Sequence, residues 1–499
     1  MAAISPSRLG GMGPGASPSL AAAPGRNDGA VGLAQKGQLR RSLRACMAEG
    51  ILAEVVGACA GGAILTAWAI YLDAGTLLTG TLVALSQLAQ LFQFPAAWIT
   101  SALGHRRACI VLVAASRQAM LPLAALPFLP VSNEVRQTIL LVVAGLSAVL
   151  GTLGNNAWVS WMSDLVPKRV RGRYFGRRTA WCTLGGALAS AAAGALLDLA
   201  KQHQRTGMAL ASLQILGAVT GLVTTWLMLR QHAPRSERRT VPLAWRWVAA
   251  PFRDASVRGL MLYLVVWNAA VGVAGSFFVL HSLRNLRMSY TLVALHATAV
   301  AAVRMLAAPV WGRLLDRMGA RPVLIACSFT IASIPFIWLF PTANFLWPLV
   351  ADAVLAGVLW SGHALAIFNL PLAITPRAER PFYLAAFATL TGLSFTLATL
   401  AGGLVAEALP DRFLLAGHEL TDLQVVFVAS GFLRFGAAFV GLRIQEPASQ
   451  TVSALWGALR PRPLEAGSAV RRLPEVANDN ARTVEAPGRA AASAGKHRS

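Results

Sequence analysis

Long apolar runs separated by short polar segments dominate the chain. Read with a window of membrane length, the hydropathy defines twelve runs, each about long enough to cross a bilayer as a helix. Their limits are 45–72, 76–100, 108–131, 138–160, 179–200, 208–229, 259–281, 290–311, 322–341, 346–374, 382–407 and 423–443. The pattern predicts an all-α membrane protein with twelve transmembrane helices.

A polar and basic break after the sixth run divides the predicted helices into two sets of six. The break contains Leu243 to Phe252, with Trp245 and Trp247, a pattern typical of an interfacial helix. The two ends of the chain are rich in Ala, Gly, Pro and Arg and are predicted to be disordered. We therefore expect a tail over 1–44, a bundle over 45–229, a linker over 230–258, a second bundle over 259–443 and a tail over 444–499.

Composition agrees with a membrane protein. Hydrophobic residues make up 56% of the chain and charged residues 13%, whereas soluble domains carry about 25% charged residues. The net charge of +23 alone would admit nucleic acid, but the arginines lie in short loops and in the tails. We therefore expect a lipid bilayer as the surroundings and no nucleic acid partner. The five cysteines fall in or beside apolar runs without ligand spacing, so they are interpreted as packing residues, with no metal and no cofactor.

The distribution of Lys and Arg predicts the orientation. If the N-terminus is cytoplasmic, the inner loops hold 20 basic residues and the outer loops hold 6. Basic residues favour the cytoplasmic side, so both termini are predicted to be cytoplasmic. The Ala- and Arg-rich composition suggests a bacterial chain and hence the bacterial inner membrane.

Short sequences recur at corresponding places in the two halves. The spacing Pro-x3-Arg-x2-Tyr follows both the fourth and the tenth run, as Pro167, Arg171, Tyr174 and as Pro376, Arg380, Tyr383. A weaker repeat follows the second and eighth runs, as Gly104 with Arg106 and Gly319 with Arg321. Two such matches indicate a duplication of a six-helix unit.

The turn between the eighth and ninth runs carries a distinctive string. Residues 312–322 read GRLLDRMGARP, and the positions of interest are Gly312, Asp316, Arg317, Gly319 and Arg321. A charged turn with two glycines cannot lie in hydrocarbon, so it marks a membrane surface. The string resembles the signature turn of the major facilitator superfamily, Gly-x-Leu-x-Asp-Arg-x-Gly-Arg-Arg. The first-half turn departs from it, because Ser101 stands where the second half has Asp316.

This resemblance implies a fold of two pseudo-symmetric six-helix bundles. It also implies a monomeric secondary transporter that moves a small solute by alternating access. The resemblance assigns the charged turn a role in the conformational cycle. Proton coupling is a further hypothesis. The alternative is a non-transporting membrane scaffold or assembly factor with the same fold, because a fold does not fix a function.

Polar residues inside apolar runs are the candidate site residues, because a polar group in hydrocarbon is costly. Glu54 lies ten residues beyond Arg44, roughly 15 Å along a helix. It is either a proton- or cation-linked carboxylate on the central cavity or a structural partner of an Arg on a neighbouring helix. Gln87 and Gln90 share one side of the second helix and either line a watered cavity or bond between helices.

The resemblance places the solute cavity mainly between helices 1, 4, 7 and 10. It thereby implies further solute contacts at Asn155, Asn156, Trp267, Asn268, Trp360, His363 and Asn369. Arg304 on helix 8 is a candidate for binding an anionic solute. The competing interpretation for the aromatic side chains and for His363 is helix packing. No nucleophile, acid–base or metal constellation near a membrane surface is evident, so we expect no enzyme activity.

Overall fold

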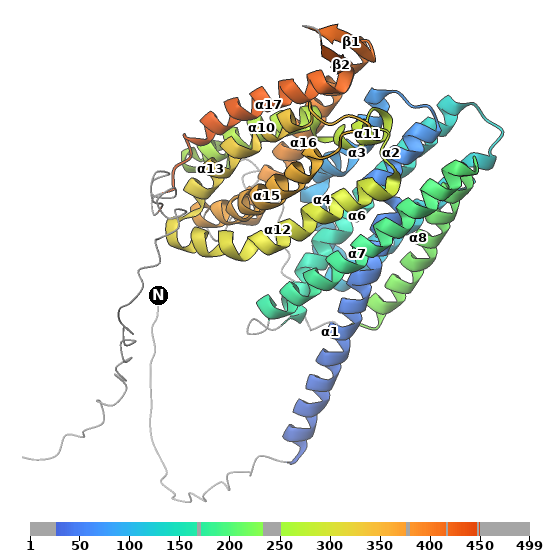
Figure 1. The fold of residues 1–499 in the computed structure, drawn as a ribbon. Coiled ribbons are helices and arrows are strands. Elements are labelled where there is room, and N and C mark those ends of the chain that lie inside the picture. Colours follow the sequence, from blue (N-terminus) through green and yellow to red (C-terminus); the bar gives the residue numbers. More distant parts are fainter. Residues whose placement is uncertain are drawn as a thin grey trace, which may run out of the picture. The chain divides into compact units, whose positions relative to one another are not determined.

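The described residues of the computed structural model are 26–166, 171–232, 251–375, 380–415, 418–446 and 449. They form helices throughout, apart from one short hairpin (Figure 1). The first half contains α1 (Arg26–Ala60), α2 (Gly62–Tyr71), α3 (Thr76–Leu88), η1 (Ala89–Phe92), α4 (Gln93–Leu103), α5 (His105–Ala119), η2 (Leu121–Phe128), α6 (Asn133–Leu165), α7 (Arg171–Gln202) and α8 (Thr206–Leu229).

The second half repeats this order. It contains α10 (Ala255–Gly275), α11 (Phe278–Arg284), α12 (Tyr290–Met318), α13 (Ala320–Ile331), α14 (Ile334–Ile337), α15 (Pro348–Ile374), α16 (Arg380–Ala408) and α17 (Asp422–Gly441). The antiparallel strands β1 (Arg412–Leu415) and β2 (His418–Thr421) connect α16 to α17, with Arg412 paired to Thr421.

The twelve-helix prediction is confirmed. Eleven described helical segments are long and apolar enough to cross a membrane. The twelfth crossing is the second one, which α3, η1 and α4 build in three pieces over residues 76–103. Large exposed apolar side chains such as Leu306 (74%) and Phe368 (67%) require an apolar environment around the bundles.

Contacts between helices repeat from one half to the other. In the first half α1 packs on α7 and α8, and in the second half α10 packs on α16 and α17. Between the halves, α7 packs on α12 and α3 packs on α16. These are the contacts of a duplicated six-helix unit, as the loop repeats predicted.

The repeated loops make equivalent bonds in the two halves. Gly104 and Gly319 end α4 and α12 with φ of +81° and +89°, which favours glycine. Two residues later, Arg106 donates to the Leu229 carbonyl at 2.7 Å, and Arg321 donates to the Leu442 carbonyl at 3.1 Å. Each arginine thus ties its turn to the end of the last helix of its own half.

The second repeat behaves in the same way. The Tyr174 hydroxyl donates to the Leu43 carbonyl at 3.0 Å, near the start of the first crossing. The Tyr383 hydroxyl donates to Asp254 Oδ2 at 2.9 Å, at the N-cap of α10. Pro167 and Pro376 lie outside the described residues, and only the backbone of Arg171 and Arg380 is described.

Three features differ from the sequence expectation. Residues 26–44 were expected in a disordered tail, but α1 begins at Arg26, because Ala, Leu, Gln, Lys and Arg are good helix formers. The strands β1 and β2 were not predicted. The third crossing ends in the 3₁₀ helix η2, where Pro122 and Pro127 have no N–H to donate to an α-helix. Most of the predicted linker helix and most of the C-terminal tail lie outside the described residues.

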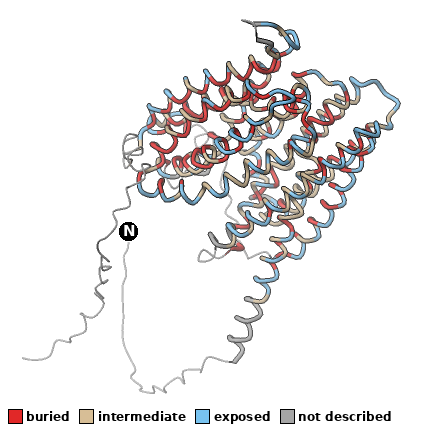
Figure 2. Tube along the Cα trace, in the orientation of Figure 1, coloured by how far each residue is buried: buried red, intermediate tan, exposed pale blue. Residues whose placement is uncertain are grey.

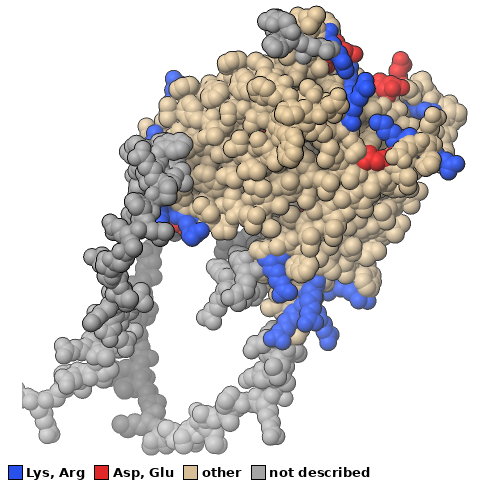
Figure 3. Space-filling model, in the orientation of Figure 1, with Lys and Arg blue, Asp and Glu red and all other residues tan. Residues whose placement is uncertain are grey.

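We call the end of the bundles with Arg106, Arg107, Arg313, Arg317 and Arg321 the basic end, and the end with β1 and β2 the hairpin end. Buried positions face the interior of the bundles, and exposed positions follow their outer faces (Figure 2). On the face in Figure 3, charged side chains gather at the ends, and a broad band between them is free of charge. This band is the expected hydrocarbon-facing belt.

Candidate functional site

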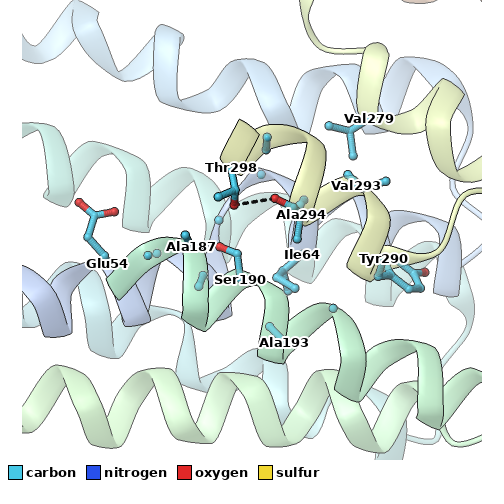
Figure 4. Close-up of a pocket in the computed structure, with 18 of the residues that line it drawn as sticks. Glu54, Ile64, Ala187, Ser190, Ala193, Val279, Tyr290, Val293, Ala294 and Thr298 are labelled. Atoms are coloured by element: carbon cyan, nitrogen blue, oxygen red, sulfur yellow. Dashed lines mark hydrogen bonds between the residues drawn. The ribbon is translucent and has the colours of Figure 1, made fainter. Parts of the chain in front are cut away.

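A cavity of about 500 Å³ lies between the two halves, which we call the central cavity. Its walls come from α1 and α2, from α7, and from α11 and α12. Most lining residues are Gly or Ala or aliphatic, and the few polar ones include Glu54, Thr183, Ser190, Tyr290 and Thr298 (Figure 4). Small side chains leave room for a solute, and the hydroxyl groups provide hydrogen-bonding partners.

Glu54 lies at one edge of the central cavity, as Figure 4 shows. It is the acidic residue among those that line the cavity, and it forms no hydrogen bond or ion pair with the described residues. A Cβ atom on Gly186 would lie 3.2 Å from Glu54 Cβ, so the glycine provides space for this side chain. The prediction that Glu54 faces the cavity agrees with this geometry.

The alternative interpretation of Glu54 was a structural ion pair with an Arg, and in the structure Glu49 forms such a pair instead. Glu49 is 3% exposed, and its Oε1 lies 2.9 Å from Arg117 Nη2 while its Oε2 lies 3.6 Å from Arg178 Nη2. Arg117 also donates to the Thr224 hydroxyl, and Arg178 stacks over Trp158 at 4.7 Å. Arg178 lies inside the first bundle, where Glu49 and Trp158 stabilise it.

The Glu49 cluster borders a smaller cavity of about 280 Å³ within the first bundle. Asn155 lines this cavity together with Glu49, Arg117, Trp158 and Arg178. Asn155 was expected on the solute cavity between the halves, and the structure places it on this separate one.

The glutamines of the second crossing bond within and between helices. Gln93 donates to Gln90 Oε1 at 2.7 Å, and Asn156 donates to Gln93 Oε1 at 3.1 Å. This chain joins the second crossing to α6. The backbone carbonyl of Gln87 lies so close to Gly392 that a Cβ atom there would clash with it, so α16 approaches closely at this point. Gln87, Gln90 and Asn156 therefore lie in helix contacts.

Several candidates from helices 7 and 10 are buried in the second bundle. Trp267 stacks on His363, with ring centroids 4.8 Å apart, and packs against Tyr263 and Trp360. The Tyr263 hydroxyl lies 2.9 Å from His363 Nε2 and 2.8 Å from the Ser328 hydroxyl. Trp267 (2% exposed) and His363 (5%) thus belong to a core network. None of these five residues lines the central cavity.

The side chains of the remaining candidates form no hydrogen bond with another helix among the described residues. Asn268 and Asn369 each donate at 2.8 Å to the carbonyl four residues earlier in their own helix. Arg304 is exposed and does not line the central cavity. Its carbonyl accepts a hydrogen bond from Ser361.

The two halves are joined at the hairpin end by Asp198 near the end of α7. Its Oδ1 accepts the Tyr290 N–H at 2.7 Å, and its Oδ2 accepts the Thr291 N–H at 2.9 Å and the Thr291 hydroxyl at 2.6 Å. These donors form the first turn of α12, where backbone N–H groups lack helical partners. A Cβ atom on Gly194 would lie 2.8 Å from the Thr291 nitrogen, so α7 and α12 approach closely there.

Glu407 makes the corresponding contact on the other side of the boundary. Its Oε1 accepts the Leu77 N–H at 2.9 Å, in the first turn of α3. Nearby, Arg284 Nη1 lies 3.4 Å from the Thr76 hydroxyl. We call the Asp198 and Glu407 contacts together the hairpin-end closure. Neither acid was predicted as a site residue, although each one stands near the end of an apolar run, where a charged residue indicates a membrane surface.

The signature turn lies at the basic end, where α12 ends. The Gly319–Arg321 turn is held within its own half, because Glu446 accepts the Ala320 and Arg321 N–H groups at 3.2 and 2.8 Å. Asp316 is exposed and has no hydrogen bond or ion pair in the described part of the chain. In Figure 1, α7 and α12 diverge toward this end. The structure is therefore closed between α7 and α12 at the hairpin end.

Comparisons with known proteins agree with this architecture. Residues 260–477 match the sequence profile of the Major Facilitator Superfamily. The nucleoside transporter NupG superimposes with a TM-score of 0.58 and 14% identity, over 81% of this chain and 98% of NupG. The inward-open xylose transporter XylE from E. coli superimposes with a TM-score of 0.60 and 12% identity, over 83% of this chain and 99% of XylE.

A D-xylose-proton symporter gives a TM-score of 0.63 at 12% identity, over 82% of this chain and all of the symporter (100%). No curated protein sequence matches the chain significantly. At these identities the solved structures establish the fold alone. The second half of the chain matches the Major Facilitator Superfamily, and the described residues have the duplicated twelve-helix fold of these solved transporters.

Proposed function

We propose that the chain is a secondary active transporter that moves a small solute across the membrane by alternating access. The observation that supports this most directly is the central cavity, which lies between the halves and is bounded at the hairpin end by the Asp198 contact. A cavity between two pseudo-symmetric bundles is where such transporters bind their solute. A scaffold would require neither the cavity nor a cavity-facing carboxylate.

Proton coupling at Glu54 is part of the proposal. Glu54 borders the central cavity and has no ion-pair partner among the described residues. A carboxylate in this position can take up a proton from one side and release it to the other as the cavity alternates. The similarity to a D-xylose-proton symporter makes sugars a reasonable first solute class, and NupG adds nucleosides.

The orientation proposed for the bundle is with the basic end in the cytoplasm. The bias of 20 inner to 6 outer basic residues supports this orientation. A cysteine at Ser236, in the segment between the halves, should not react with an impermeant maleimide added to intact cells. Rapid labelling of Ser236→Cys would reverse the assignment.

Transport can be tested before the solute is identified. Purified protein is reconstituted into liposomes that contain a low-molecular-weight cell extract supplemented with uridine and xylose. Solutes that leave are then identified by mass spectrometry. We expect selective release of one solute class compared with protein-free liposomes. Ser190→Trp, which would fill the central cavity, should abolish this release.

The control variant is Leu188→Trp, since Leu188 is on the same helix and is 65% exposed on its surface. It should release the same solutes as the unmodified protein. If no solute leaves faster than from protein-free liposomes, the proposal of transport is contradicted and the scaffold alternative is favoured.

A further inference from the structure

We propose that His296 and Asp352 form a proton-binding site in the second bundle and that this site controls the hairpin-end closure. His296 Nε2 on α12 lies 3.0 Å from Asp352 Oδ2 on α15. The Asp352 side chain is 5% exposed and the His296 side chain 19%. The proposal rests on the alternating-access function, but its experiment requires no solute.

The surroundings of Asp352 limit the charge states of the pair. Trp338 Nε1 donates to Asp352 Oδ1 at 3.0 Å, so one carboxylate oxygen is engaged and the other faces His296. Arg434 on α17 is the nearby cation; it is 2% exposed and forms no ion pair or hydrogen bond within the described part of the chain. One buried carboxylate thus balances one buried guanidinium. A proton on His296 adds a positive charge in contact with Asp352.

A second histidine belongs to the same cluster but does not touch the carboxylate. His281 on α11 packs edge-on against Trp338, with ring centroids 6.3 Å apart, and is 1% exposed. The described titratable and charged groups that face the pair are therefore Arg434 and His281. Because His281 shares the aromatic packing but lacks the carboxylate contact, it offers a matched control for His296.

The pair has access to the exterior of the bundle. His296 lines a separate cavity of about 490 Å³ between α12, α15 and the turn before α15. That cavity includes Asn344, which is exposed in the turn at the hairpin end. This space thus extends from His296 to the turn at the hairpin end and is separate from the central cavity.

The helix α12 connects this site to the closure and to the central cavity. Ala294, Ala297 and Thr298 line the central cavity, whereas Leu295, His296 and Ala299 line the other one. The helix begins with Tyr290 and Thr291, which bind Asp198. His296 is five residues beyond Thr291, about 7.5 Å along the axis.

This placement gives the expected direction of the effect. A proton on His296 adds an attraction to Asp352, 3.0 Å away, which should hold the first turns of α12 against α15 in the position where Asp198 binds them. Loss of the proton removes this attraction. We therefore expect the hairpin-end closure to be tighter when His296 is protonated and to open more often when it is neutral.

The experiment measures the closure directly with spin labels. In a background without the five cysteines, Lys201→Cys and Thr342→Cys place one label on each half at the hairpin end, where both residues are exposed. The distance distribution is recorded by double electron–electron resonance in lipid nanodiscs at a series of values between about pH 6 and 8.5. We expect the population with the longer distance to increase severalfold as the pH rises.

Variants assign this change to the pair. His296→Gln should abolish the pH dependence and keep the longer-distance population at its high-pH level, and Asp352→Asn should also abolish the dependence. His281→Gln should retain it. If the unmodified protein shows no pH dependence, or if His296→Gln retains it, the proposal is overturned.

A purely structural role predicts a different outcome. Trp338→Phe removes a hydrogen bond to Asp352 but keeps an aromatic ring. In that case Trp338→Phe would lower the stability as much as His296→Gln does. The pH dependence of the label distance would remain in both variants. Should His296→Gln fail to fold, titration of ¹³C-labelled histidines in the unmodified protein and in His281→Gln still decides. The proposal would be overturned if no histidine resonance changed with pH over the same range as the label distance. These measurements do not depend on solute release, so a failure of this proposal can be distinguished from a failure of the proposed transport function.

Discussion

Asp198 and Glu407 occupy equivalent positions in the two bundles, and each binds the first turn of a helix in the opposite bundle. Asp198 accepts three hydrogen bonds from Tyr290 and Thr291, and Glu407 accepts one from Leu77. The helices that they join, α7 with α12 and α16 with α3, exchange places under the pseudo-twofold relation of the halves. One duplicated feature thus closes both sides of the boundary.

Removal of these charges should open the hairpin end. Hydrogen bonds to charged groups contribute about 1.5–3 kcal/mol each, so Asp198→Asn should raise the open population by about tenfold or more. Glu407→Gln should have a smaller effect, because Glu407 is exposed and accepts a single bond. The measurement is the spin-label distance between positions 201 and 342.

The matched control is Glu134→Gln, since Glu134 is an exposed acid at the same end within one bundle. It should leave the distance distribution unchanged. Equal distributions for Asp198→Asn and the unmodified protein would show that the carboxylate does not hold the two halves together.

Glu49→Gln should destabilise the first bundle. The change removes a buried charge that compensates Arg117 and Arg178. Loss of one partner of a buried ion pair costs about 3–5 kcal/mol. We expect a clear decrease in the thermal unfolding temperature in detergent.

The double variant Glu49→Gln with Arg117→Met should recover part of that stability, because only Arg178 is then left without its acidic partner. Asp316→Asn is the control, since Asp316 is exposed. A Glu49→Gln protein as stable as the unmodified one would remove the structural role of this cluster.

The Tyr383–Asp254 contact predicts a pH dependence outside the membrane. Hydrogen bonds from Ser256 and from the Tyr383 hydroxyl hold the pKa of Asp254 below its ordinary value. A lowered pKa means that the contact stabilises the fold fully above the unfolded value of about 3.9. The contribution is lost as the pH falls through the lower folded value.

Tyr383→Phe removes one donor and should move the pKa of Asp254 back toward its ordinary value. The measurement is the ¹³C shift of the Asp254 carboxyl during acid titration. Tyr174→Phe, the equivalent change in the other half, should leave that titration unaffected. An unchanged pKa in Tyr383→Phe would mean that Ser256 alone is responsible.

The fold was predictable because hydropathy and duplication act over many residues. A bilayer requires about 20 apolar residues for a crossing, so the twelve runs and their limits follow from the sequence. The second crossing was predicted as a helix, but its division at Ala89–Phe92 was not. The hairpin β1–β2 was missed because it lies in a short polar loop.

The candidate site was less predictable, because the rotation of each helix about its axis decides which residues face the cavity. Glu54 does face it, whereas Trp267 and His363 point into the core of the second bundle. Asp352 lies on α15, but its partners Trp338 and His296 come from other parts of the chain. Contacts between helices distant in sequence cannot be inferred from one sequence without covarying positions.

Glu54→Gln tests the proposed coupling site. The amide keeps the size of the side chain but cannot carry a proton in exchange. Because Glu54 has no ion-pair partner among the described residues and lies at the cavity edge, the variant should fold with the stability of the unmodified protein. This distinguishes it from Glu49→Gln, for which a loss of stability is expected.

The functional effect should be selective. In liposomes, Glu54→Gln should lose accumulation of solute driven by a proton gradient, while exchange of solute without a gradient continues at a similar rate. Exchange requires only the alternation of the cavity. Accumulation requires a proton to move in each cycle, either with the solute or in the opposite direction. Accumulation that persists in a stable Glu54→Gln protein would exclude this carboxylate from coupling and would leave the His296–Asp352 pair as the remaining proton site to be tested.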